Sequence, residues 1–379
     1  MTIVKETAPH IHRKDSLARM LIDVLIALAP VSITSIVVHQ WAAVRNLVIS
    51  VAVMMLCEFI FVLIKNGIPF DGQKHSLKER FLHGVKGYRV HHALAPIVSA
   101  VIYAQIMPVS SDPGYVVYVA LIAGAVFGMV IGKLVFGGTG QNIFNPAAVG
   151  MVFAKLCFGS RYVYATNDYV SVTNAGGTLL TNLTADTTSL VGRYANIGDF
   201  SALDMFLGRI PGTMGEGFKF AILIGMAYLL IRRAADFRVI VSYLGFYLLA
   251  MAVAGIFVVT KVPGVDYFQF LAFQLLTGGV LFGATYMLTD PVTMPINRPG
   301  RVMYGLLAAG ITVVIRLFGA LPEGVAFSIL IANAVAPALD HYSYSGNAYT
   351  KKKLLVIGGI AVVFLLAVIL GLAFQEGTI

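Results

Sequence analysis

A block rich in glycine and asparagine interrupts the apolar sequence in the first half of the chain. It runs Gly137-Gly138-Thr139-Gly140-Gln141-Asn142-Ile143-Phe144-Asn145-Pro146-Ala147-Ala148. Glycines such as Gly138 and Gly140 let a ligand approach the backbone closely, and the amides of Asn142 and Asn145 both donate and accept hydrogen bonds. This combination suits the polar edge of a flat heterocyclic cofactor. The other interpretation is a helix start, with Asn145 as N-cap and Pro146 at the first helical position.

A second polar block closes a later apolar run. It reads Thr285-Tyr286-Met287-Leu288-Thr289-Asp290-Pro291-Val292-Thr293, and Arg298 and Arg301 follow. Thr289 and Asp290 are its candidate binding residues, for a cofactor or an ion. Asp290 could equally cap a helix or anchor the loop, and both interpretations stay open.

Four ionisable residues lie within or at the edges of apolar runs: Asp23, Glu58, Lys155 and Arg316. A charge inside a membrane costs several kcal/mol unless it is paired, so such residues are functional candidates by default. Asp23 and Glu58 are the candidates for ion coupling, with simple interfacial pairing as the alternative. No residue is assigned a catalytic role, and no metal site is expected, because Cys57 and Cys157 fall in apolar surroundings.

The composition places these residues in a membrane protein. The chain is 58% hydrophobic and 12% charged, with a mean hydropathy of +0.83, whereas an ordinary soluble domain has about 25% charged residues. Apolar runs of about 20 residues recur along the chain, which is the length needed to span a bilayer. We predict an all-α polytopic protein with about 10–11 transmembrane helices, at 20–38, 46–64, 91–107, 115–132, 143–158, 218–231, 239–259, 268–288, 302–318, 324–340 and 354–374.

Basic residues predict the orientation of the chain. With the N-terminus inside, 19 of the 27 Lys and Arg fall in inner segments and 5 in outer segments. The formal net charge of +9 is therefore explained by topology, and nucleic acid is not an expected partner. We expect a multi-pass protein of the cytoplasmic (inner) membrane of a prokaryote, with a cytoplasmic N-terminus.

The predicted organisation is five segments: a cytoplasmic segment (1–19), two transmembrane halves (20–158 and 218–342), an extracytoplasmic loop between them (159–217), and a basic cytoplasmic loop with an extra helix (343–379). Val135-Phe136-Gly137 with Asn145-Pro146-Ala147 resembles Leu317-Phe318-Gly319 with Asn333-Ala334. The two patterns lie five spans apart, so they would have opposite orientations. This favours a 5+5 inverted repeat followed by an additional C-terminal helix.

The two polar blocks also resemble a known family. Residues 135–150 are similar to the Gly-Gly-x-Gly-x-Asn-x-Phe-Asn-Pro-Ala signature of the B-type subunit of the Na+-translocating NADH:quinone reductase and the D-type subunit of the Rnf complex. Thr289-Asp290-Pro291-Val292-Thr293 and Pro322-Glu323-Gly324 resemble the Rnf protein more closely. The resemblance covers about residues 20–342.

The resemblance implies two flavins: FMN bound covalently through its phosphate to an outer threonine, and riboflavin bound noncovalently toward the inner side. The family's Ser-Gly-Ala-Thr string is absent from the outer segment. The best positional match for the acceptor is Thr188, followed by Thr187 and Thr173.

The expected function follows from this resemblance. It implies a subunit of a translocating oxidoreductase, of the ferredoxin:NAD or NADH:quinone type, that relays electrons through flavin and couples this to Na+ or H+ transport. Catalysis would occur only within the complex, whose other membrane and peripheral subunits include a second subunit with covalent flavin. The alternatives are a channel or secondary transporter of small solutes, and a structural membrane subunit without covalent flavin.

Overall fold

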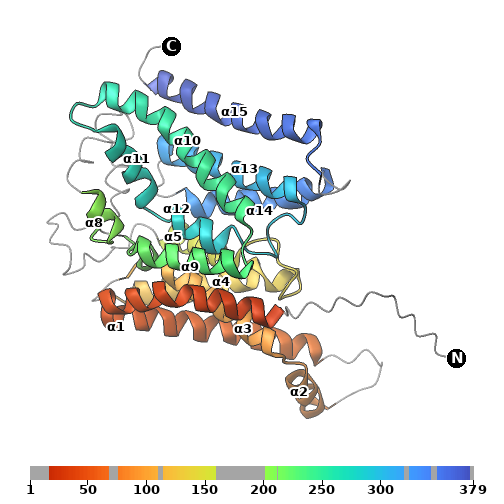
Figure 1. Ribbon diagram of the computed structural model, residues 1–379. Helices are drawn as coiled ribbons and strands as arrows, with labels where there is room; N and C mark the ends of the chain where they lie inside the picture. Colours follow the sequence, from red (N-terminus) through yellow and green to blue (C-terminus); the bar gives the residue numbers. More distant parts are fainter. Residues whose placement is uncertain are drawn as a thin grey trace.

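The computed structural model describes most of the chain. The described residues are 17–67, 76–109, 114–158, 201–210, 212–319, 324–342 and 348–375. Within them the secondary structure is helical, with no strand (Figure 1). Long apolar runs fold in this way because only a helix satisfies its backbone donors and acceptors without help from water. The predicted all-α polytopic fold is confirmed.

The first half holds helices that match the first five predicted spans. They are α1 (Leu17–Asn66), α2 (Leu77–Lys86), α3 (Val90–Ile106), α4 (Tyr115–Gly132), η1 (Leu134–Phe136) and α5 (Pro146–Phe158). Gln40, with φ of 49°, breaks α1 into two helices, which correspond to the spans predicted at 20–38 and 46–64.

The second half holds the remaining spans. Its elements are α8 (Ala202–Phe206), η4 (Met214–Glu216), α9 (Lys219–Arg232), α10 (Phe237–Lys261), α11 (Tyr267–Leu276), α12 (Val280–Phe282), η5 (Gly283–Met287), α13 (Arg298–Phe318), α14 (Val325–Tyr342) and α15 (Lys351–Gln375). Five described helices are long and apolar enough to cross a membrane, with the kinked α1 counted as one, and the α11–α12 pair makes a sixth. Three shorter apolar helices coincide with other predicted spans: Val90–Ile106, Pro146–Phe158 and Val325–His341.

The span predicted at 268–288 is broken. Helix α11 and the segment Val280–Met287 meet at an angle of 54°, and η5 is a π-helical turn. Arg316 of α13 stabilises the break, because its guanidinium donates to the carbonyls of Gln274 and Thr277, each at 2.8 Å. The last carbonyls of a helix lack intrahelical partners, so a buried cation there satisfies them.

Helices α4 and α5 approach each other closely through glycine. A methyl group on Gly128 would lie 2.4 Å from the carbonyl oxygen of Pro146. One on Gly150 would lie 2.5 Å from that of Gly124. Small residues four apart allow this packing in a membrane, where association depends on van der Waals contact. The close fit fixes the start of α5, and with it the polar block that precedes this helix.

The contacts between helices repeat in the two halves. Helix α4 packs against α5, and α13 packs against α14, which are the corresponding spans of the second half. Across the halves, α1 contacts α9, and α5 contacts α14. These pairs are the corresponding spans of the predicted 5+5 repeat, so the contact pattern favours that repeat. The two halves therefore form one packed unit rather than separate domains.

Residues near the end of the predicted outer loop lie inside the protein. Thr213, Met214 and Glu216 are buried, and the hydroxyl of Ser35 donates to the carbonyl of Met214 at 3.2 Å.

Helix α15, by contrast, is largely exposed. It lies at the edge of the molecule (Figure 1), and residues such as Leu355 and Val363 remain exposed.

Candidate functional site

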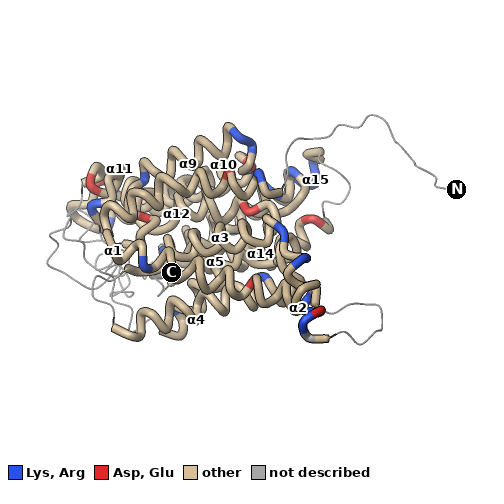
Figure 2. The backbone as a smooth tube through the Cα atoms, turned by 90° about the horizontal axis from the view of Figure 1, so that it is seen from below, with Lys and Arg blue, Asp and Glu red and all other residues tan. Residues whose placement is uncertain are grey.

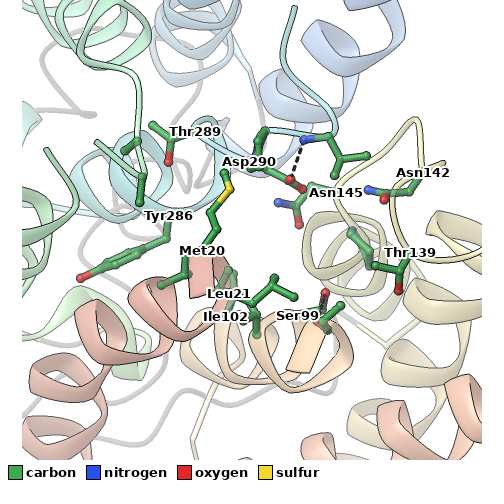
Figure 3. A pocket seen from close by; sticks show the side chains of 18 of the residues that line it. Met20, Leu21, Ser99, Ile102, Thr139, Asn142, Asn145, Tyr286, Thr289 and Asp290 are labelled. Atoms are coloured by element: carbon green, nitrogen blue, oxygen red, sulfur yellow. Dashed lines mark hydrogen bonds between the residues drawn. The ribbon is translucent and has the colours of Figure 1, made fainter. Parts of the chain in front are cut away.

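A pocket forms where the two polar blocks meet. Its polar wall comes from the loop after η1 and from the segment that runs from η5 into the following loop, and its apolar wall comes from α1, α3 and α9 (Figure 3). The empty space within it measures about 840 Å³, part of it open to solvent. The polar residues that line it are Ser99, Lys133, Thr139, Asn142, Asn145, Thr285, Tyr286, Thr289 and Asp290.

The first polar block enters the pocket through a loop that requires glycine. Gly137, Gly138 and Gly140 have φ values of 117°, 96° and 90°, a region that favours glycine. The side-chain oxygen of Asn145 accepts from the backbone N–H groups of Ala147 and Ala148 at 3.0 and 3.3 Å. The helix-start interpretation therefore holds for Asn145, which caps α5.

Asn145 also links the first polar block to the segment that follows the break in the span 268–288. Its amide nitrogen donates to the carbonyl of Met287 at 3.4 Å. Its backbone N–H donates to the side-chain oxygen of Asn333 at 3.0 Å, when the Asn333 amide is oriented to donate to the Tyr304 hydroxyl. Asn145 and Asn333 are the asparagines of the two similar sequence patterns, and they meet in the interior of the protein.

The second polar block presents a carboxyl group to the pocket. Asp290 accepts from the backbone N–H of Val292 at 3.0 Å, so it anchors the loop, and it also lines the pocket (Figure 3). Burial raises the pKa of the Asp290 carboxyl, and the Val292 N–H and the charge of Lys133 oppose this only partly. Asp290 can therefore hold a proton at a higher pH than an exposed aspartate. The Thr289 hydroxyl donates to the carbonyl of Thr285 at 2.5 Å, within its own turn.

A buried charged cluster lies behind the pocket. The Lys133 ammonium is 3.2 Å from a Glu58 carboxylate oxygen, and both side chains are almost wholly buried. The other oxygen of Glu58 accepts from the Thr139 hydroxyl at 3.0 Å and lies 3.5 Å from Nδ1 of His92. Because Lys133 and Thr139 line the pocket, the cluster joins its wall to α1 and α3.

Asp23 is paired across the two halves. Its carboxylate accepts from the Tyr228 hydroxyl at 2.9 Å and from the Arg232 guanidinium at 3.3 Å. Both ion-coupling candidates thus have charged partners within the protein. Their role in ion transport stays a prediction.

The structure brings together five of the residues predicted from the two blocks: Gly140, Asn142, Asn145, Thr289 and Asp290. Gly138 lies outside the lining, and a methyl group there would be 3.0 Å from the ring of Phe61. Thr173, Thr187 and Thr188 lie outside the described residues.

Sequence reasoning missed several pocket residues. Ser99 lies in an apolar run where nothing distinguishes it from other helix residues, and Tyr286 lies within the second polar block but was not singled out as a binding residue. The charge pattern treats Lys133 as an inner-loop cation, but it is buried and paired with Glu58. These two residues are 75 positions apart, and no local pattern in the sequence joins them.

Comparisons with known proteins identify several relatives of this chain. The B-type subunit of the Na(+)-translocating NADH-quinone reductase of Chromohalobacter salexigens is 37% identical over 271 residues, which cover 71% of this chain and 62% of that protein. The corresponding subunit of Ectopseudomonas mendocina is 29% identical, with 91% of this chain and 88% of that protein covered. The D-type subunit of the ion-translocating oxidoreductase complex of Stutzerimonas stutzeri is 28% identical, with 89% and 95% covered.

The family comparison covers nearly the whole chain. The sequence pattern of the NQR2, RnfD, RnfE family matches residues 4–348, which include both polar blocks and every helix that lines the pocket. Helix α15 lies beyond the match. The chain belongs to the NQR2, RnfD, RnfE family.

Proposed function

We propose that this chain is the flavin-carrying membrane subunit of an ion-translocating electron-transport complex, of the Rnf or NADH:quinone reductase type. It relays electrons across the membrane and couples this to the movement of Na+ or H+. The observation that carries the proposal is the convergence of the two polar blocks on one pocket in a member of this family. The names of its relatives, which describe Na(+)-translocating or ion-translocating complexes, support the same reaction class.

The chemistry of the pocket suits a noncovalently bound flavin, riboflavin in this proposal. Leu21, Val24 and Ile102 offer apolar surface for the faces of a ring, whereas Asn142 and Asp290 offer polar groups for its edge. A bound flavin supplies one- and two-electron redox chemistry, while the protein positions the ring and sets its electrostatic environment.

The residues of the chain have separate tasks in this proposal. The apolar wall excludes water, and Asn142 orients the ring. Asp290 holds a proton beside it, which its raised pKa favours. The Lys133–Glu58 pair places a cation at the pocket wall without leaving an unpaired buried charge. We assign no step of ion transport to an individual residue.

The proposal includes a second flavin on the outer side. FMN would be joined through its phosphate to a threonine of the segment 159–217, with Thr188 first, then Thr187 and Thr173. The wider complex would supply the remaining membrane and peripheral subunits, one of them with its own covalent flavin. The subunit would lie in the inner membrane of a prokaryote with its N-terminus in the cytoplasm.

A flavin inventory of the purified subunit tests both sites. Solvent extraction of the native protein should release about one flavin per chain, and fluorescence that migrates with the denatured chain should reveal the covalent one. Ser99→Leu should remove most of the extractable flavin, because Leu fills the pocket while the Ser99 hydroxyl serves only the Ala95 carbonyl. Thr188→Ala should abolish the covalent fluorescence and spare the extractable flavin.

Thr260→Leu is the matched control for the pocket variant. The Thr260 hydroxyl makes the same kind of bond, to the carbonyl four residues earlier, but it is exposed at the far end of α10. Its flavin content should equal that of the native protein. A native subunit that carries no flavin would contradict the proposal, and so would equal extractable flavin in Ser99→Leu and Thr260→Leu.

A further inference from the structure

A second cavity on the same end of the molecule is lined by arginine. The arginine cleft, as we call it, is lined by Arg233, Arg238, Arg298 and Arg301, together with Asp236. Asp236 is the one carboxylate among its described lining residues. The empty space within the cleft is about 1,340 Å³, part of it open to solvent.

Two of the arginines are held in place. Asp236 accepts from the Arg238 guanidinium at 3.0 Å and also from Arg301, whose Nε donates to the carbonyl of Pro295 at 2.9 Å. The guanidinium of Arg238 lies 4.7 Å from the centre of the Phe237 ring. One carboxylate thus orders two of the cations, and binding a ligand would require little further ordering of these side chains.

Two helix ends add to the positive potential. Helices α10 and α13 both begin at this cleft, at Phe237 and Arg298. The N-terminal end of a helix carries a partial positive charge, which favours an anion. Figure 2 shows more Lys and Arg toward the end of the molecule with α2 and the start of α15 than toward the end with α11. Orientation in the membrane accounts for basic residues at one end, but not for four guanidinium groups around one cavity.

Arg233 occupies an unusual backbone position for this side chain. It follows α9 with φ of 56° and ψ of 28°, the left-handed conformation that usually selects glycine at the end of a helix. A glycine there would suit the backbone and would remove the side chain together with its guanidinium. The position therefore allows a test that separates ligand binding from folding.

Apolar surface adjoins the cleft. The side chains of Ile231, Phe237 and Val241 are 80%, 55% and 63% exposed, as expected for residues that face acyl chains. We propose that the arginine cleft binds the phosphate head group of an anionic phospholipid, whose acyl chains lie along this surface. Arginine recognises phosphate through paired N–H···O bonds, and basic pockets between membrane helices suit phospholipid head groups with more than one charge.

Lipid titration of the purified full-length chain tests the proposal. The probes are cardiolipin and phosphatidylcholine, followed by native mass spectrometry and by the shift of the melting temperature. The native chain should retain cardiolipin in preference to phosphatidylcholine. Arg233→Gly and Arg298→Gln should each weaken cardiolipin binding about fivefold, the contribution of one basic residue near a membrane surface.

Lys261→Gln is the matched control, because Lys261 lies at the opposite end of α10. It should leave cardiolipin binding unchanged, and Arg233→Gly should melt no lower than the native chain in lipid-free detergent. Equal lipid binding by the native chain and both arginine variants would overturn the proposal. Equal protection by inorganic phosphate would assign the cleft to a soluble anion instead. A loss of extractable flavin in Arg233→Gly would assign it to a phosphate-bearing cofactor, because the cleft and the flavin pocket share Met20, Ala234, Ala235 and Pro291.

Discussion

Lys133 and Glu58 form a buried ion pair at the wall of the pocket. Substitutions can separate the cost of burying one charge from the benefit of pairing it with the other. Two charges taken out of water are tolerated when they face each other, whereas one left alone is strongly destabilising. The Thr139 hydroxyl supports the pair by donating to Glu58. The pair therefore explains how a cation can stand beside an apolar cavity.

Lys133→Met should lower the free energy of unfolding by about 3–5 kcal/mol, because it leaves the Glu58 carboxylate buried without its counter-ion. The double variant Lys133→Met/Glu58→Gln removes both charges and should recover most of this loss. Thermal unfolding of the purified chain in detergent measures both effects.

Lys86→Met is the control for this pair, since the Lys86 side chain is exposed at the end of α2. It should change the stability by no more than about 0.5 kcal/mol. If Lys133→Met unfolded at the same temperature as Lys86→Met, the pair would have no structural role.

At the scale of helices, the sequence predicts where the helices lie, but it does not predict where a span is broken. Every span predicted from apolar length contains a helix, because burial of backbone polar groups in lipid leaves few other choices. The break within 268–288 was not predicted. Thr277-Gly278-Gly279 is its only local signal, and the stabilising contact comes from Arg316, 39 residues beyond Thr277.

The close approach of α4 and α5 depends on glycine. Gly128→Ala should destabilise the protein by about 1–3 kcal/mol, because the added methyl group meets the Pro146 carbonyl and the backbone of Gly150. It should also lower the amount of extractable flavin, since Pro146 follows the capping residue Asn145 at the pocket wall. Melting temperature and flavin content are the two measurements.

Gly245→Ala is the matched control for this substitution. Gly245 lies within α10, and a methyl group there would meet nothing within 4 Å. The control should be neutral or should raise stability by up to about 1 kcal/mol, since alanine favours a helix more than glycine does. Equal stability of the two variants would argue against the glycine contact.

At the scale of the whole molecule, the pairing of the halves explains where the pocket lies. The contacts of α1 with α9 and of α5 with α14 join the halves, and both polar blocks meet at that junction. The sequence suggested the repeat from Asn145 and Asn333, and the structure brings these residues into contact. The walls from α1, α3 and α9 could not be predicted, because their pocket residues are ordinary apolar side chains such as Leu21 and Leu229.

The predicted orientation has a direct test. The distribution of basic residues predicts that the N-terminus and the segment 343–350 lie in the cytoplasm and that the end of α15 lies on the other side. A fluorescent reporter that folds only in the cytoplasm should be active when fused after residue 348 and inactive when fused after residue 379. A periplasmic reporter should give the reverse pattern, and the same pattern at both fusion sites would contradict the orientation.

The central claim is that the pocket between the two polar blocks holds a flavin. An experimental density map of this subunit within its native complex tests it most directly. The expected result is planar density for one flavin ring between Asn142 and Asp290 on one side and Leu21 and Ile102 on the other. A map in which this pocket contains only lipid or solvent, while the noncovalent flavin of the subunit lies elsewhere, would contradict the claim.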